Sequence, residues 1–148
     1  MSYGDSTAIT ITLASLADTG QRQAAAVENS DSFVDILIGG KIKTGTGSGA
    51  GDYVDIYASA SADDGTTYGG DCSGADAAYA GTTSNLPAFL GRIDTETAET
   101  TFEFGSLSIA VAFGGTVPKF FTLVFENQSD STLDATPANH AVHYQGVH

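Results

Sequence analysis

The feature that most constrains this chain is the apolar run at residues 119–127, which is KFFTLVFEN. It holds three Phe together with Leu and Val, and it follows a Gly-Gly-Thr-Val-Pro segment that disfavours a helix. A run of this length, rich in aromatic and β-branched residues and bounded by turn residues, predicts a strand buried on both faces. Such a strand needs neighbouring strands and cover on both sides, so the rest of the chain must supply them.

Alternate residues of this strand face opposite sides of its sheet. We expect Phe121, Leu123 and Phe125 to face the core between two sheets. Phe120 and Val124 then need a second cover, which a loop or a neighbouring subunit would supply.

Further strands are predicted where apolar and polar residues alternate. In residues 33–43 the apolar face carries Val34, Ile36, Ile38 and Ile42, and we expect a hairpin from there to residues 53–58 around a flexible glycine-rich loop at 44–51. Further strands are expected at residues 8–13, 86–93, 101–109 and 138–144. Residues 21–29 are expected to form an extended segment or a single turn. Bulges or close backbone approaches are indicated by the glycines at Gly39, Gly40 and Gly105.

These seven or eight strands, with no convincing helix of ten residues, predict an all-β fold. The economical architecture is a two-sheet antiparallel β-sandwich of jelly-roll type with about eight strands. At 148 residues we expect one domain, residues 1–148, with a short N-terminal arm at about residues 1–8. Residues 61–84 are turn-rich and predict a long surface excursion, a kind of segment that is often functional.

Charge and composition restrict the classes of partner. The chain has 18 acidic and 5 basic residues, a net charge of −13, and its cations form no basic run. Phosphate backbones would repel such a chain, so nucleic acid is not an expected partner. We expect neither a membrane span nor a signal peptide, because no long apolar segment is present. The single Cys72 excludes an intramolecular disulfide framework.

Two clusters of residues raise the question of a metal site. His140 and His143 lie three residues apart on a predicted strand and therefore face opposite sides, which favours packed or exposed histidines over a shared ion. Asp63 and Asp64, with further aspartates downstream, could supply oxygens to Ca²⁺, but the Asp-Gly pair favours a tight turn. We expect no metal and no cofactor.

No catalytic motif is recognisable in the sequence. Cys72 has no base nearby in sequence, and no Gly-x-Ser-x-Gly elbow precedes an Asp and a His. The glycines of residues 45–49 are not followed by the Lys-Ser/Thr pair of a phosphate loop. We therefore expect a protein that is not an enzyme and has no catalytic residues.

Several runs resemble those of small structural proteins of tailed bacteriophages. They lie at residues 9–17, 22–23, 26–30, 41–45, 53–57, 61–65, 112–118, 127–135 and 144–146. The resemblance covers most of the chain, and its motifs are turns and strand edges. It implies a jelly-roll capsid decoration protein that sits on the outer surface of the major capsid shell and cements it. A tail or neck structural protein is the alternative within the same class.

The resemblance also implies partners and a location. The expected partners are the major capsid protein and further copies of this chain, with a trimer favoured, and the expected location is the capsid surface of a virion made in the host bacterial cytoplasm. We expect the interface to come from the N-terminal arm and the loops at 44–51 and 61–84. The candidate residues are Ser2, Tyr3, Thr7, Gly47, Ser48, Asp63, Asp64 and Tyr68.

An alternative from another class is a carbohydrate-binding β-sandwich module. Such modules stack sugars on exposed aromatic rings, and Tyr53 and Tyr57 share the outer face of one predicted strand. Cross-strand packing is the competing role for the same two side chains.

Overall fold

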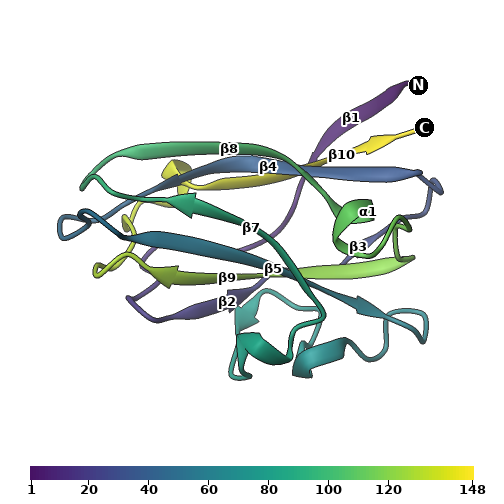
Figure 1. Cartoon of the computed structure of the whole chain (residues 1–148), viewed down its shortest axis with the longest axis horizontal. Coiled ribbons are helices and arrows are strands. Elements are labelled where there is room, and N and C mark those ends of the chain that lie inside the picture. The colour runs from purple at the N-terminus through teal and green to yellow at the C-terminus, as the bar shows by residue number, and fades with distance from the viewer.

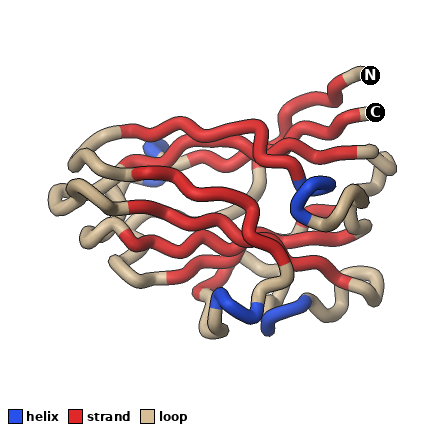
Figure 2. The backbone as a smooth tube through the Cα atoms, viewed as in Figure 1, coloured by secondary structure: helices blue, strands red, loops and turns tan.

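The structure is a computed structural model that describes all residues from Met1 to His148. Two antiparallel sheets pack face to face, with loops at the two ends of the sandwich and a long segment between β5 and β7 along the outside of sheet B (Figures 1 and 2). The first sheet, called sheet A, is ordered β1 (Tyr3–Ala8), β10 (Ala141–Val147), β4 (Asp35–Lys43) and β8 (Thr101–Ser108). Sheet B is ordered β6 (Ala77–Ala78), β2 (Gln21–Gln23), β9 (Phe120–Gln128), β5 (Tyr53–Ser61) and β7 (Ala88–Asp94), and β3 (Val27–Glu28) also pairs with β9.

Helical structure is confined to single turns. They are α1 (Ile109–Ala112), η1 (Gly69–Asp71), η2 (Thr83–Asn85) and η3 (Pro137–Asn139). The expectation of no helix of ten residues is therefore confirmed.

The connections between strands are those of a jelly roll. With β2 and β3 taken as one interrupted strand and β6 set aside, eight strands remain, four in each sheet. Every connection crosses from one sheet to the other except the one from β5 to β7, which are hydrogen-bonded neighbours. The expected fold class, an antiparallel jelly-roll sandwich, is confirmed.

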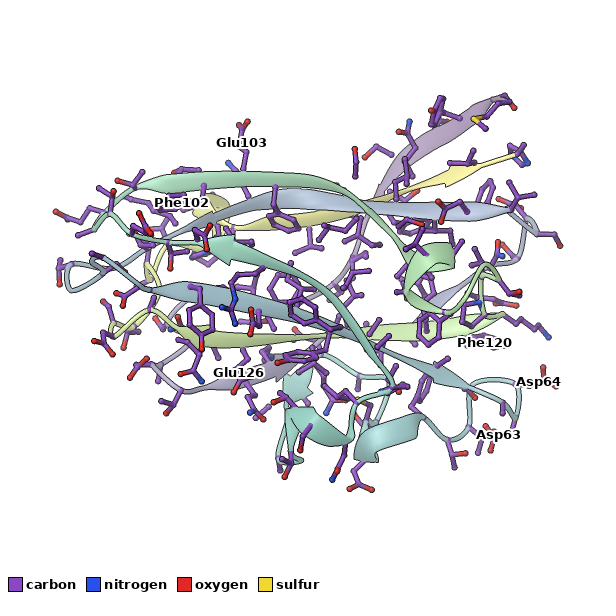
Figure 3. All side chains as sticks on the ribbon, viewed as in Figure 1. Asp63, Asp64, Phe102, Glu103, Phe120 and Glu126 are labelled. Atoms are coloured by element: carbon purple, nitrogen blue, oxygen red, sulfur yellow. The ribbon has the colours of Figure 1, made fainter.

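Strand β9 lies at the centre of sheet B, between β2 and β5. Phe121, Leu123 and Phe125 are fully buried and belong to the core between the sheets, as predicted. The core is completed from sheet A by Ile36, Ile38 and Ile42 of β4. On the neighbouring strand β8, Figure 3 shows Glu103 directed away from the sandwich, whereas Phe102 packs against the core.

The outer face of β9 is covered by the excursion at residues 61–84. Val124 is fully buried there in a second cluster, named here the second core, formed by Tyr68, Cys72, Tyr79, Leu86 and Val124. Phe120 is partly buried against the same cluster. A loop or a neighbouring subunit was expected to cover this face, and the structure shows that a loop of the same chain does so.

The prediction of a strand at residues 8–13 was wrong. The strand is β1, and the following segment crosses between the sheets: Ile9 N donates to Val142 O in sheet A, and Thr10 O accepts from Ala25 N beside sheet B, both at 2.9 Å. Ile9 and Leu13 are buried, so the alternation reflects packing at the side of the sandwich. The residues expected to form an arm are thus a strand, which pairs with β10.

The predicted hairpin was also wrong, because β4 belongs to sheet A and β5 to sheet B. The loop at 44–51 bridges the sheets and is held by hydrogen bonds. Thr44 Oγ1 donates to Thr97 O at 2.7 Å, and Ser48 Oγ donates to Ser129 O at 3.3 Å. Both side chains are buried, so the loop is a fixed part of that end of the sandwich.

Two smaller differences concern strand ends. Val34, expected to face the core, precedes β4 and is 64 % exposed. The last strand begins at Ala141, after the turn η3, and continues to Val147.

The predicted bulge is present. The register between β4 and β8 shifts between Ile38 and Gly40, and Ser106 on β8 has a φ of 58°. A Cβ on Gly39 would lie 3.1 Å from Phe104 O, which explains the glycine at this close approach.

Candidate interaction surface

The aspartates considered for Ca²⁺ are engaged separately. Asp63 closes a turn: its carboxylate accepts from Thr67 N at 2.8 Å, Thr67 Oγ1 at 2.6 Å and Ser61 Oγ at 2.8 Å. These hydrogen bonds, from the Thr67 side chain above all, lower the pKa of Asp63 to about 2. Asp64 pairs with Lys119 at 2.9 Å, and both aspartates lie at an exposed loop tip (Figure 3). The geometry is that of a turn with one surface ion pair.

The three histidines occupy separate places. His140 Nε2 lies 2.8 Å from Asp134 O, and its Nδ1 accepts from Lys43 N at 3.4 Å. His143 lies on β10, and the ring of His148 packs edge-on against Phe33, with centroids 4.7 Å apart. No group of three or more His, Cys, Asp or Glu side chains is arranged to hold a metal ion.

The two tyrosines of β5 are both engaged by β7. The guanidinium of Arg92 lies 3.6 Å from the centroid of the Tyr53 ring and is held by two hydrogen bonds to the buried Asp55, at 2.7 and 2.8 Å. Tyr57 packs edge-on against Phe89, its partner on β7, at 5.4 Å. Both contacts are cross-strand packing. Arg92 covers one face of the Tyr53 ring, the kind of surface on which a sugar would stack.

Cys72 is a buried member of the second core. Burial raises the pKa of its thiol to about 11. A thiol with so high a pKa is almost entirely protonated at neutral pH, which makes it a poor nucleophile.

The candidate interface residues are distributed over separate regions. Ser2, Tyr3 and Thr7 are exposed on or beside the edge strand β1, and Asp63 and Asp64 are exposed at the tip after β5. Gly47 is exposed, but Ser48 is buried in the loop between the sheets and Tyr68 is buried in the second core. The side chains of Ser48 and Tyr68 are therefore inside the fold and not on its surface.

A different grouping emerges from the exposed apolar side chains. Five large hydrophobic residues are exposed: Met1, Tyr3, Val34, Phe89 and Val111. All except Phe89 lie at the end of sheet A where β1 begins, β4 begins, β10 ends and α1 follows β8 (Figure 1). We name this group, Met1, Tyr3, Val34 and Val111, the strand-end patch.

Hydrogen bonds join the segments that carry three of these residues. The Asp35 carboxylate accepts from Ser108 Oγ at 2.8 Å and from Ala110 N at 3.0 Å, so it fixes α1 beside the start of β4. Val34 N donates to Val147 O at 2.8 Å, and Tyr3 is paired with Val147. Backbone and carboxylate contacts thus hold Tyr3, Val34 and Val111 on adjoining segments.

The Phe33 ring packs against β1 and β10 at this end of sheet A. Asn29 accepts from Phe33 N at 2.8 Å and donates to Phe33 O at 3.1 Å, which fixes the backbone at that point. The Phe33 ring lies where a Cβ on Gly146 would be, and a Cβ on Gly4 would lie 3.5 Å from it. The two glycines therefore make room for the ring.

The charge around the strand-end patch is acidic. Asp5 on β1 and Asp31 before Phe33 are both exposed. Four of the five cations are in ion pairs elsewhere, namely Arg22–Asp76, Lys43–Asp134, Arg92–Asp55 and Lys119–Asp64. The fifth, Lys41, lies within β4 opposite Glu103 of β8.

Sequence reasoning nominated Tyr3 but missed Val34 and Val111. Val34 was placed on the inner face by its spacing from Ile36, and Val111 lay outside the predicted strands. The sequence carries no signal for this grouping, because it depends on hydrogen bonds from Ser108 Oγ and Ala110 N to the Asp35 carboxylate, which no spacing rule links across the chain.

Comparison with protein-family models, with curated proteins and with solved structures finds no match for this chain. None of the helices has the length and apolar character needed to cross a membrane.

Proposed function

We propose that the protein is a non-enzymatic virion structural protein, a decoration protein that binds the outer surface of the major capsid shell and stabilises it. The resemblance of its turns and strand edges to small phage structural proteins supports this. The jelly-roll fold is compatible with it, since capsid proteins use that fold, but lectins and cupins use it too.

The observation that carries the proposal is the strand-end patch. Four of the five exposed large hydrophobic residues lie on segments at one end of sheet A, and exposed apolar surface is typical of a protein interaction site. None of the four residues of the patch belongs to the runs that carry the resemblance, so the patch is a separate argument for a protein partner. The protein would act on the shell as a homo-oligomer, with a trimer favoured.

The decisive experiment is cryo-electron microscopy of virions made with and without this protein. We expect density on the outer capsid surface that is lost in its absence, at positions where subunits of the shell meet. Density lost from the tail or neck, with the capsid surface unchanged, would replace decoration by a tail or neck role.

A second measurement tests the stabilising activity. Shells with and without the protein are heated, and release of DNA is followed with an intercalating dye. Decorated shells should release DNA at a higher temperature, and equal release temperatures would contradict a cementing role.

A further inference from the structure

We propose that the outer face of sheet B binds a neutral oligosaccharide, an activity separate from the binding of a capsid shell. The site runs from a groove beside β2 across the sheet to the stacked pair of Tyr53 and Arg92. Strand register and direct contacts place its residues together, and their hydrogen-bonding groups indicate the class of ligand.

A row of polar side chains crosses four neighbouring strands of sheet B. Glu126 on β9 is paired with Gln21 of β2 on one side and with Asp55 of β5 on the other. Asp55 is in turn paired with Arg92 of β7. Because Phe125, the residue before Glu126, faces the core, the row faces outward. Neighbouring strands lie about 4.8 Å apart, so the row spans about 14 Å, the length of a short oligosaccharide.

The polar groups of this row are fixed, and two of them are open to a ligand. Gln21 Nε2 donates to Glu126 Oε1 at 3.2 Å, and Gln128 Nε2 donates to the same oxygen at 3.0 Å, which leaves Glu126 Oε2 open. Arg92 donates from Nε and Nη2 to the two oxygens of Asp55, at 2.7 and 2.8 Å, which leaves its Nη1 open. Arg92 is exposed and Glu126 is half-buried. The row therefore presents a carboxylate acceptor and a guanidinium donor whose directions are set before a ligand arrives.

The groove continues the row at the edge of sheet B. It has a volume of about 520 Å³, within the range of ~300–1,000 Å³ that small-ligand sites occupy. Gln21 lines it, so the groove and the row share this residue. The walls of the groove come from the segments 12–22 and 78–81, and they carry the exposed hydroxyl groups of Ser15 and Thr19 among alanines and glycines. These short side chains leave room for a ligand with a rigid ring.

The charges of the site favour an uncharged ligand. Arg22 is the only charged residue that lines the groove, and it is paired with Asp76 at 2.7 Å. Arg92 is paired with Asp55. An anion therefore finds no unpaired cation here, in a chain whose net charge is −13. A metal ion finds no group of three carboxylate, histidine or cysteine ligands.

Hydroxyl groups match the open positions of the row. A sugar hydroxyl both donates and accepts hydrogen bonds, so hydroxyls along a sugar chain can pair with Glu126 Oε2 and with Arg92 Nη1. Recognition depends on these bonds rather than on stacking, because Arg92 covers one face of Tyr53. Jelly-roll domains include lectins, so the fold is compatible with this role.

The test measures binding of soluble cello-, manno-, xylo- and galacto-oligosaccharides to the purified protein by isothermal titration calorimetry, with anionic oligogalacturonides as a comparison. We expect at least one neutral series to bind, with an affinity that salt does not change, because no ion pair with the ligand is involved. The double variant Gln21→Ala, Glu126→Ala should bind about tenfold more weakly or worse, as follows from losing hydrogen bonds to a charged group.

The matched control is Glu103→Ala, which also removes a glutamate from the outer face of a strand. Figure 3 shows Glu103 and Glu126 on opposite sides of the sandwich, so the control should bind within about twofold of the unmodified protein. Circular dichroism and thermal unfolding confirm that each variant is folded.

A second pair of variants tests the groove. Ala17→Trp places a large side chain at an exposed position of the groove wall and should lower the affinity by about tenfold or more, because the indole takes the space of the ligand. Ala62→Trp adds the same side chain at an exposed position outside the groove and should leave the affinity unchanged.

The remaining outcomes each overturn a stated part of the inference. If no neutral series binds, the inference fails, and decoration of the shell is unaffected. Binding of the oligogalacturonides alone, or binding that weakens with salt, would show an ionic ligand and overturn the neutral class. Full binding by the site variants, or equal loss in their controls, would overturn the location on sheet B.

Discussion

The second core makes a quantitative prediction at Val124. This side chain lies on the outer face of β9 and is fully buried under residues of the excursion. Val124→Ala removes two methyl groups from an environment without water, and each is worth about 0.8 kcal/mol by transfer. The remaining cavity adds to this, so we expect the free energy of unfolding to fall by about 2 kcal/mol.

Guanidinium denaturation followed by circular dichroism measures this change, and a thermal scan should show a decrease in Tm of about 4–8 °C. The same substitution at the exposed Val111 is the control and should cost less than about 0.5 kcal/mol. If the excursion were a detachable loop, Val124 would be exposed whenever the loop opened. A loss below about 1 kcal/mol, the range of strand propensity alone, would then refute the second core as part of the fold.

Three further predictions concern polar and titratable groups. Asn127→Ala should cost about 3 kcal/mol in denaturant unfolding, because the two N–H groups of the buried Nδ2 are shared among three carbonyl oxygens, those of Leu16, Ala17 and Ser131. A loss under about 1 kcal/mol would show that those carbonyls find other donors. Hydrogen bonds, chiefly from the side chains of Thr67 and Asn139 respectively, lower the pKa of Asp63 and of Asp134 in the folded state from 3.8 to about 2. The folded state thus binds fewer protons, so this stabilisation is present above about pH 4 and is lost as the pH falls toward about 2. The double variant Asp63→Asn, Asp134→Asn should flatten the pH dependence of the free energy of unfolding in that range. An unchanged slope would contradict the assignment of the pH dependence to these two carboxylates. Burial raises the pKa of the Cys72 thiol from 9.0 to about 11, so iodoacetamide at pH 8 should label the native protein at least ~100-fold more slowly than the unfolded protein, and equal rates would show an open second core.

Local patterns were sufficient where the environment of a strand is set by its own residues. The run at β9 predicted burial on both faces because five successive residues there are apolar or small enough to bury, and the burial of Phe121 through Phe125 agrees. The strand predicted at residues 101–109 is likewise present as β8, with the bulge expected from its glycine, and Phe102 and Phe104 pack against the core.

Pairing over long distances could not be predicted in the same way. β1 has the sequence YGDSTA and is held by backbone pairing with β10, so it carries no apolar periodicity. The switch of sheet between β4 and β5 depends on contacts such as Ser48 with Ser129, which no local pattern records. Tyr68 and Tyr79 follow no period, because they come from turns that converge on Val124.

The candidate surface was anticipated in part. Tyr3 was nominated from its place in the expected arm, but the patch depends on Asp35 joining the start of β4 to α1. Ser48 and Tyr68 were nominated because their loops are polar or rich in glycine, yet both side chains are buried within the chain itself.

The position of β10 has a consequence for how the protein reaches this structure. β10 lies between β1 and β4, so β1 has no strand to pair with until the last strand of the fold is in place. The contacts that close sheet A therefore span almost the whole chain, as in the pairing of Tyr3 with Val147. Folds dominated by such distant pairings form in milliseconds to seconds rather than microseconds. On a ribosome, sheet B and the β4–β8 pair can form first, and the strand-end patch is assembled only when β10 joins them.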